Sequence, residues 1–370
     1  MIHKNERELF MKKSQKNRKM ILVAFTIVIE IMLNACGKEN EQVVNNQGKH
    51  AEYEEKLEDK REIDLDFKQE IFADEQPLNM INSYEDLNVA TYITKLDDTP
   101  MYFISDCYHD QILYNDNIDD EISKWKVLTK DVHYAHTIAT DGQVMVIDDT
   151  ENNRVIIFNR LEDGRFAKAQ IIEGIGMKPH FVYYDVQNKV FMVWSSITGE
   201  MYYIKRPTGN ASEFVPLYVD KVLKIEELFG VYVRSFSVID DSIYFVSGHN
   251  NSKIIKADKT NLNIEEYFEV PDEIAGMVQV SRIQDYFYIT VSTDANENQD
   301  YATIIRTKDL SLLIEGKYED IYDEFGINGG TPYYINCIDG RYYMSHHRTG
   351  ENILVFDVID NDICNVEVIY

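Results

Sequence analysis

Residues Asp141–Phe158 read DGQVMVIDDTENNRVIIF, and this stretch decides the fold. It contains two short apolar runs of strand type, Val144–Ile147 and Val155–Phe158. A polar segment rich in Asp and Asn, Asp148–Arg154, lies between them. Short β-branched runs separated by Asp and Asn residues are typical of antiparallel strands joined by tight turns. The stretch therefore predicts a β-hairpin.

Similar hairpins recur along the chain. The turn positions equivalent to that of Asp149 are spaced by 43–53 residues and fall at Asp106, Asp149, Ser195, Gly248, Asp294 and His347. Each hairpin has a further strand-like run upstream, and most have one downstream. Four strands per repeat at a period of about 40–50 residues is typical of β-propeller blades. The sequence predicts an all-β, six-bladed β-propeller, with five or seven blades as alternatives because the unit at Tyr286 is weak.

The hairpin also resembles the NHL-type propeller repeat, whose core reads roughly V-x-V-x-D-[ST]-x-N-x-R-[IV]-x-[VI]-F. The matching positions are Met145, Ile147, Asp149, Thr150, Asn152, Arg154, Val155, Ile157 and Phe158. Propellers in general bind ligands at one mouth of the central channel, where the innermost strands start. We expect Asp149 to accept backbone N–H bonds in its own turn and Arg154 to pair with an adjacent blade. Ring closure is expected to use either the segment Asp66–Phe72 or plain packing of one blade on another.

The first 35 residues predict an export signal. A basic region, Lys12–Lys19, precedes a mostly apolar run of 14 residues, Met20–Leu33. This run is short for a membrane-spanning helix and fits the central part of a signal peptide. It ends in LNACG at 33–37, which resembles a bacterial lipobox and implies cleavage before Cys36 and acylation of its thiol. A charge in the apolar run and an asparagine before the alanine depart from the usual pattern, so an uncleaved anchor is the alternative.

The predicted domains are a lipoprotein signal peptide at 1–35, a tether at 36–75 and the propeller at 76–370. From Lys38 to Glu70 the chain is dominated by charged and amide residues. Such a segment has too few apolar side chains to order itself. The two acyl chains of a lipoprotein give stable anchoring. We therefore expect a chain that is lipid-anchored to the cell membrane and faces outside the cytoplasm.

The composition excludes several classes of function. The formal net charge is −27, so we expect no nucleic-acid partner, because binding to phosphates needs clustered Lys and Arg. Besides Cys36 the chain has only Cys107, Cys337 and Cys364, an odd number that cannot all pair as disulfides. The sequence contains no G-x-S-x-G, H-E-x-x-H, P-loop or C-x-x-C motif, so no catalytic residue is predicted.

The candidate ligand-binding residues are those that the repeat places around one channel mouth, namely His136, His180, Trp194, Arg234 and His347. Together they offer charge-assisted donors and a stacking plane for an anionic or sugar-like ligand. The structural alternatives are hydrogen bonds from the histidines to neighbouring blades and packing of the tryptophan inside a blade. Histidines from separate blades, with no carboxylate fixed by spacing, do not predict a metal site. The sequence indicates no cofactor.

These observations favour an extracytoplasmic lipoprotein whose NHL-like propeller binds a small molecule, a glycan or a protein at the channel mouth. The alternative is an extracytoplasmic hydrolase or lyase, lactonase-like, with its site at the same mouth. Two carboxylates and a histidine that converge within about 4 Å would favour the enzyme. A polar mouth with aromatic side chains and no such convergence would favour binding.

Replacing Cys36 by serine tests the predicted membrane anchor. We expect the Cys36→Ser protein to leave the membrane fraction or to accumulate as an unprocessed precursor, because serine has no thiol to acylate. Cell fractionation and labelling with a radioactive fatty acid measure both effects. A variant that is still lipid-labelled and normally processed would contradict the lipobox.

Overall fold

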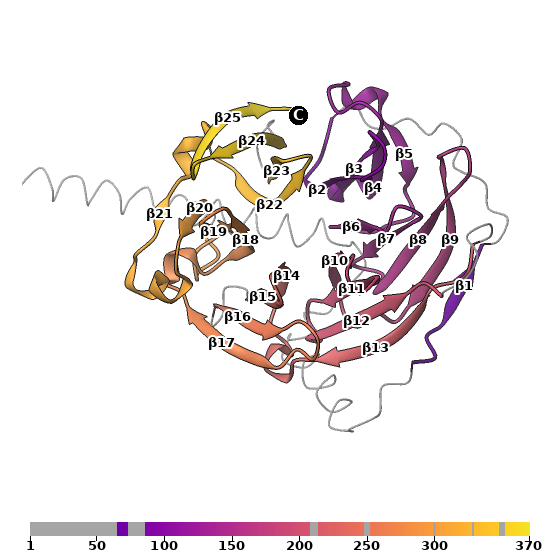
Figure 1. The fold of residues 1–370 in the computed structure, drawn as a ribbon, viewed down its shortest axis with the longest axis horizontal. Coiled ribbons are helices and arrows are strands. Elements are labelled where there is room, and N and C mark those ends of the chain that lie inside the picture. Colours follow the sequence, from indigo (N-terminus) through magenta and orange to yellow (C-terminus); the bar gives the residue numbers. More distant parts are fainter. Residues whose placement is uncertain are drawn as a thin grey trace, which may run out of the picture. The chain divides into compact units, whose positions relative to one another are not determined.

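The computed structural model describes residues 65–72, 86–207, 214–247, 252–298, 301–327, 329–347 and 352–370. Within them the chain forms six antiparallel sheets, which stand as blades around a central axis (Figure 1). The predicted all-β, six-bladed propeller is confirmed. The predicted signal peptide, Cys36 and most of the predicted tether lie outside the described residues.

Each blade contains four consecutive strands, and the first of these four is the innermost (Figure 1). Blade 1 contains β2 (Ala90–Lys95), β3 (Tyr102–Asp106), β4 (Gln111–Asn115) and β5 (Lys126–Thr129). Blade 2 contains β6 (Ile138–Thr140), β7 (Val144–Asp149), β8 (Arg154–Arg160) and β9 (Phe166–Glu173). Blade 3 contains β10 (Pro179–Asp185), β11 (Val190–Ser195), β12 (Glu200–Lys205) and β13 (Tyr218–Lys224).

The other three blades follow the same order. Blade 4 contains β14 (Val233–Ile239), β15 (Ser242–Ser247), β16 (Lys253–Asp258) and β17 (Ile264–Glu269). Blade 5 contains β18 (Met277–Ile283), β19 (Tyr286–Val291), β20 (Thr303–Thr307) and β21 (Glu319–Asp320). Blade 6 contains β22 (Thr331–Ile338), β23 (Arg341–His347), β24 (Ile353–Ile359) and β25 (Asp362–Val368). The described helices are short 3-10 turns: Cys107–His109, Ile122–Lys124, Glu226–Leu228, Asp272–Ile274, Leu310–Glu315 and Tyr322–Phe325.

The repeat read from the sequence has the correct register. In blades 1, 2 and 3 the last residue of the second strand pairs with the first residue of the third. These pairs are Asp106 with Gln111, Asp149 with Arg154, and Ser195 with Glu200. These are the positions that the 43–53-residue spacing had marked as equivalent. The spacing therefore identified the hairpin of each of these blades.

The turn after β7 differs from the expectation in its hydrogen bonds. Asp149 is fully buried and accepts from the backbone N–H of His133, at 2.7 Å, in the loop that enters the blade. Arg154 was expected to pair with an adjacent blade, but its Nε donates to Asp149 of its own hairpin at 2.6 Å. Its Nη2 donates to Asp131, at 3.2 Å, in the same entry loop. Asp149 and Arg154 of this hairpin thus connect the entry loop of the blade to the turn.

A buried hydroxyl donates to a backbone carbonyl of the next blade at each of the six blade interfaces. The pairs, with donor first, are Ser105 to Ala135 (2.6 Å), Thr150 to Pro179 (2.7 Å), Ser196 to Val233 (2.8 Å), Ser235 to Val278 (2.6 Å), Thr290 to Tyr333 (2.7 Å) and Ser345 to Thr91 (2.6 Å). The acceptors lie at or near the starts of the innermost strands. These bonds therefore align the innermost strands around the axis.

The ring closes by packing of blade 6 on blade 1, without strand exchange between them. A shared apolar cluster includes Ile93 and Leu113 of blade 1 and Val355 of blade 6. The hydrogen bond from Ser345 to Thr91 lies at the same interface. The segment that was the other candidate for closure forms β1 (Gln69–Ile71), which pairs with β9 as a fifth strand of blade 2. The expected start of the propeller at residue 76 thus leaves out one strand of its sheets.

Loss of the ring-closing hydroxyl should weaken the whole propeller. The variant Ser345→Ala leaves the buried carbonyl of Thr91 without this donor, which we expect to lower the free energy of unfolding by about 1–3 kcal/mol. Ser281→Ala is the control, because the hydroxyl of Ser281 is buried without a hydrogen-bond partner among the described residues. Chemical denaturation measures both variants. Equal losses in the two variants would contradict the role of the interblade bond.

Candidate functional site

A β-bulge recurs near the start of the innermost strands. The register between the first and second strands shifts across Thr91 in β2, His180 in β10, Arg234 in β14 and Val278 in β18. In β22 the shift spans Tyr333 and Tyr334. Because a bulge changes the direction of a side chain, it gives a local reason why these residues depart from the regular alternation of the strand. Two of them are the predicted ligand residues His180 and Arg234.

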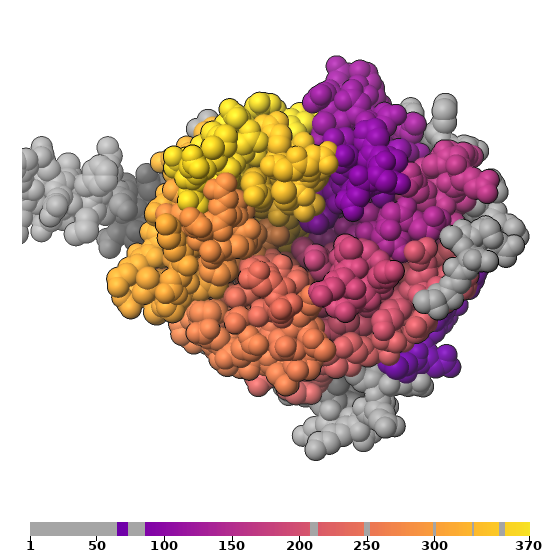
Figure 2. All heavy atoms as spheres, in the orientation of Figure 1, coloured from indigo at the N-terminus to yellow at the C-terminus, as the bar shows by residue number. Residues whose placement is uncertain are grey.

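Four of the five predicted ligand residues come together where the innermost strands start. With two tyrosines they form a cluster, which we call the histidine mouth: His136, His180, Tyr232, Arg234, Tyr333 and His347. The rings of His136 and His180 have centroids 3.7 Å apart, and those of Tyr333 and His347 are 4.6 Å apart. The guanidinium of Arg234 lies 5.6 Å from the centre of the Tyr232 ring. In the view of Figure 2 the molecular surface is hollowed at the centre of the ring.

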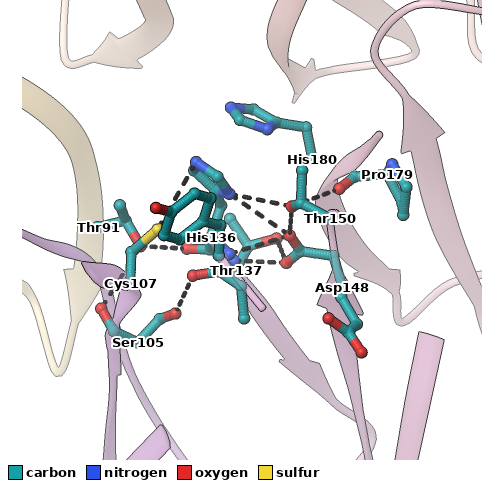
Figure 3. A network of polar contacts seen from close by, with 12 residues as sticks. Thr91, Ser105, Cys107, His136, Thr137, Asp148, Thr150, Pro179 and His180 are labelled. Atoms are coloured by element: carbon teal, nitrogen blue, oxygen red, sulfur yellow. Dashed lines mark hydrogen bonds and ion pairs between the residues drawn. The ribbon is translucent and has the colours of Figure 1, made fainter. Parts of the chain in front are cut away.

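His136 is held by the hairpin of its own blade and by a cysteine of blade 1 (Figure 3). Its backbone N–H donates to Oδ2 of Asp148 at 2.9 Å. Its Nδ1 lies 3.0 Å from Oγ1 of Thr150, and its Nε2 lies 3.9 Å from Sγ of Cys107. Burial lowers the pKa of His136 to about 3. The imidazole is therefore neutral at physiological pH.

Asp148 is the carboxyl group that supports His136. It is fully buried, and burial raises its pKa to about 7, although the backbone N–H groups of His136 and Thr137 and the hydroxyls of Thr137 and Thr150 lie within hydrogen-bond distance. Oγ1 of Thr150 lies 3.0 Å from Oδ2 of Asp148 and 2.7 Å from the carbonyl oxygen of Pro179. The hydroxyl has only one proton, so it can donate to only one of the two. A carbonyl can only accept. A protonated Asp148 that donates to Thr150, which in turn donates to Pro179, satisfies both contacts.

Two histidine nitrogens of the mouth have no hydrogen-bond partner among the described residues. Nε2 of His180 lies 3.2 Å from the hydroxyl of Tyr333 and 3.3 Å from that of Tyr232. Nδ1 of His180 and Nε2 of His347 are buried, and no described residue bonds to either. Burial lowers the pKa of both histidines, that of His347 to about 3. An unpaired buried polar group costs about 1–3 kcal/mol, so a ligand that bonds to these nitrogens would recover that cost.

Arg234 supplies the positive charge of the mouth. It is half-buried and donates from Nη1 to Oγ of Ser292 in the neighbouring blade. Among the described residues no carboxylate forms an ion pair with its guanidinium. Lys178, a nearby cation, is instead paired with Glu151 at 2.8 Å. Because a desolvated cation without a counter-ion is unfavourable, Arg234 is the group in the mouth that is best prepared to bind an anion.

Trp194 does not belong to the mouth, and its assignment as a ligand platform is wrong. Its side chain is fully buried, with its ring centroid 4.5 Å from that of Phe245 in blade 4. Its indole N–H donates to the carbonyl of Val233 at 3.2 Å. The ring is thus packed in the apolar core with its N–H satisfied, and the structural alternative of packing describes this residue.

An aromatic layer closes the axis beside the mouth. It contains Tyr92, Phe181, Phe236 and Tyr334, which come from blades 1, 3, 4 and 6. Phe181 contacts the other three with ring centroids 6.3, 5.2 and 5.2 Å away, respectively. The mouth therefore ends at a packed floor.

The site contains few groups suited to catalysis or metal binding. One carboxyl group lies near its histidines, with Oδ2 of Asp148 at 3.9 Å from Nδ1 of His136. Within the described parts of the chain, no three His, Cys, Asp or Glu residues are grouped so as to hold a metal ion. The three described cysteines after Cys36 are free thiols, and burial raises the pKa of the Cys107 thiol. No described helix is both long and apolar enough to cross a membrane.

Comparison with known proteins supports the fold. No protein-family model matches this sequence, and no curated protein matches it. Among solved structures it is similar to a putative 6-phosphogluconolactonase from Bacteroides uniformis, with a TM-score of 0.54 at 12% identity over 78% of this chain and 88% of that chain. A second protein of that description, from Bacteroides fragilis, has a TM-score of 0.55 at 11% identity over 74% and 82%. Sqt1 from Saccharomyces cerevisiae has a TM-score of 0.51 at 11% identity over 79% and 88%. At these identities the likeness shows a β-propeller and no more.

The buried histidines predict a loss of stability in mild acid. In the folded protein the pKa of His136 and of His347 is about 3, against 6.5 for an ordinary histidine. Below pH 6.5 the unfolded chain binds protons that the folded chain does not, so the free energy of unfolding falls by up to about 1.4 kcal/mol per pH unit for each histidine. Asp148 offsets part of this loss of stability. Its pKa in the folded protein is raised to about 7, so protonation of its carboxyl group stabilises the folded state as the pH falls from about 7 towards 3.8.

The double variant His136→Gln/His347→Gln should therefore show a shallower loss of stability than the wild type between pH 6.5 and about pH 5. Chemical denaturation at a series of pH values measures the slope. Each single variant is expected to give an intermediate slope. Identical slopes for the wild type and the double variant would show that these histidines are charged in the folded state.

Proposed function

We propose that the protein is a lipid-anchored, extracytoplasmic binding module whose NHL-like propeller takes up a small anion at the histidine mouth. The observation that carries this proposal is Arg234, a half-buried guanidinium that no described carboxylate neutralises. This is unusual in a chain with a net charge of −27, in which an arginine has many acidic side chains available for pairing. The anchor rests on the LNACG motif at 33–37, and the NHL-like class rests on the hairpin at 141–158.

The chemistry of the mouth suits a carboxylate or a phosphate. A guanidinium offers a planar fork of N–H donors that matches both groups. The neutral imidazole of His180 adds Nδ1, which no described residue occupies. It can present an N–H without taking up a proton while Nε2 accepts from a tyrosine hydroxyl. The hydroxyl of Tyr232 is a further donor close to both His180 and Arg234. An anion would thus meet one full charge and several neutral donors on a packed floor.

The second candidate is a hydrolase of the lactonase type. It is favoured by the position of His136 between Asp148 and Cys107, and by the name of the two Bacteroides structures, which implies action on a phosphorylated lactone. However, only one carboxyl group approaches the histidine, and the pKa of the Cys107 thiol is raised by burial. Turnover of glucono-δ-lactone that is lost in His136→Gln would favour this candidate over simple binding.

The anion site is tested by replacing Arg234. We expect the wild-type protein to bind inorganic phosphate or acetate, and the variant Arg234→Gln to bind at least about tenfold more weakly, since a hydrogen bond to a charged group contributes about 1.5–3 kcal/mol. Arg282→Gln is the matched control, because Arg282 also lacks a described carboxylate partner but is exposed and donates to the carbonyl of Gln284. Isothermal titration calorimetry measures the affinities.

Equal affinity of Arg234→Gln and the wild type would contradict the proposed site, as would a wild-type protein that binds neither anion. Circular dichroism of each variant confirms that it is folded. An equal loss of affinity in Arg282→Gln would indicate a general effect of charge, and the mouth would no longer be the proposed site.

A further inference from the structure

A cavity lies at the other end of the axis, where the innermost strands end. It has a volume of about 300 Å³ and is lined by the last residues of β2, β6, β10 and β22. We call it the tyrosine pocket after its polar lining, which includes Tyr92, Thr94, Tyr183, Tyr184 and Asn336. The aromatic layer that forms the floor of the histidine mouth separates the two ends. This volume is at the lower end of the range for ligand pockets, which is about 300–1,000 Å³.

The hydrogen-bonding groups of this pocket are largely unused. No described residue forms a hydrogen bond with the hydroxyl of Tyr92, Tyr183 or Tyr184. The amide nitrogen of Asn336 donates to the carbonyl of Ile93 at 3.0 Å, which fixes the side chain and leaves its oxygen as an acceptor. Burial raises the pKa of Tyr92 and of Tyr183, so both hydroxyls keep their protons. The pocket thus offers several neutral donors and acceptors to one ligand.

The charges near the pocket do not favour a charged occupant. Lys95 is paired with Asp339 at 2.5 Å, so these two lining residues neutralise each other. The remaining charge, Asp97, is exposed at the rim. An anion would meet no free cation among these residues, in contrast to Arg234 at the histidine mouth. An ion of either sign would also have to leave water for a lining made mainly of tyrosine rings, apolar side chains and uncharged polar groups.

We propose that the tyrosine pocket is a second binding site, and that it takes a neutral saccharide of one or two sugar rings. A saccharide presents hydroxyl groups together with apolar C–H faces. Tyrosine rings and hydroxyls complement both, because tyrosine combines an apolar face with a polar end. The small volume limits the ligand to this size. The proposal does not depend on anion binding, since none of the residues that line this pocket belongs to the histidine mouth.

The test uses glucose, N-acetylglucosamine and lactose as probes, with affinity measured by calorimetry. We expect at least one of them to bind the wild-type protein, and to bind Arg234→Gln with the same affinity. Tyr92→Phe and Tyr183→Phe keep the aromatic rings and remove only a hydroxyl, so each should fold and weaken binding roughly 2- to 10-fold. Val186→Trp should abolish binding, because Val186 lines the pocket and is 69% exposed, so that a larger side chain at its rim blocks entry without disturbing the core.

The proposal is overturned if none of the three saccharides binds the wild-type protein. It is also overturned if binding survives Tyr92→Phe, Tyr183→Phe and Val186→Trp unchanged, since the saccharide then lies elsewhere. Spermidine or phosphate binding that these same variants remove would show that the occupant is charged. Loss of saccharide binding in Arg234→Gln alone would move the site to the histidine mouth.

Discussion

The hydroxyl-to-carbonyl hydrogen bonds between neighbouring blades fix the positions of the innermost strands relative to one another along the axis. Their acceptors are at or next to the residues that make the histidine mouth: the carbonyls of Ala135, Pro179 and Val233 directly precede His136, His180 and Arg234. Tyr333 is itself an acceptor. The contacts that close the ring therefore also fix where the site residues stand. A shift of one blade along the axis would break an interblade bond and separate the side chains of the mouth.

Burial then decides the electrostatics of this end of the propeller. Three buried histidines lie close together at the mouth. Burial lowers the pKa of each, so each is neutral at physiological pH. The proposed anion site does not require charged histidines, because the guanidinium of Arg234 supplies the positive charge. The opposite end has no such uncompensated cation among its lining residues. The two ends of one axis thus differ in the kind of ligand that their chemistry favours.

The sequence pattern located most of this architecture because hairpin spacing and strand periodicity are local properties. It placed His136, His180 and Arg234 at the starts of innermost strands, where the structure has them. It misplaced Trp194, because spacing identifies the second strand of a blade without showing what packs against each face. It did not single out Tyr232, which cannot be distinguished by residue type in a chain with 25 tyrosines. The segment Asp66–Phe72 was considered only for closing the ring, and its pairing with β9 as a fifth strand of blade 2 was not predicted. Its pairing and the closure of the ring depend on contacts between distant segments.

The proposed anion site rests on Arg234, whose guanidinium forms no ion pair with a described carboxylate and donates to Ser292. A crystal structure of the protein grown at neutral pH and soaked in phosphate tests it most directly. We expect an anion bound to the guanidinium of Arg234, close to Tyr232. A guanidinium that turns away from the mouth, or that is paired with a carboxylate of the protein while phosphate is in excess, would contradict it.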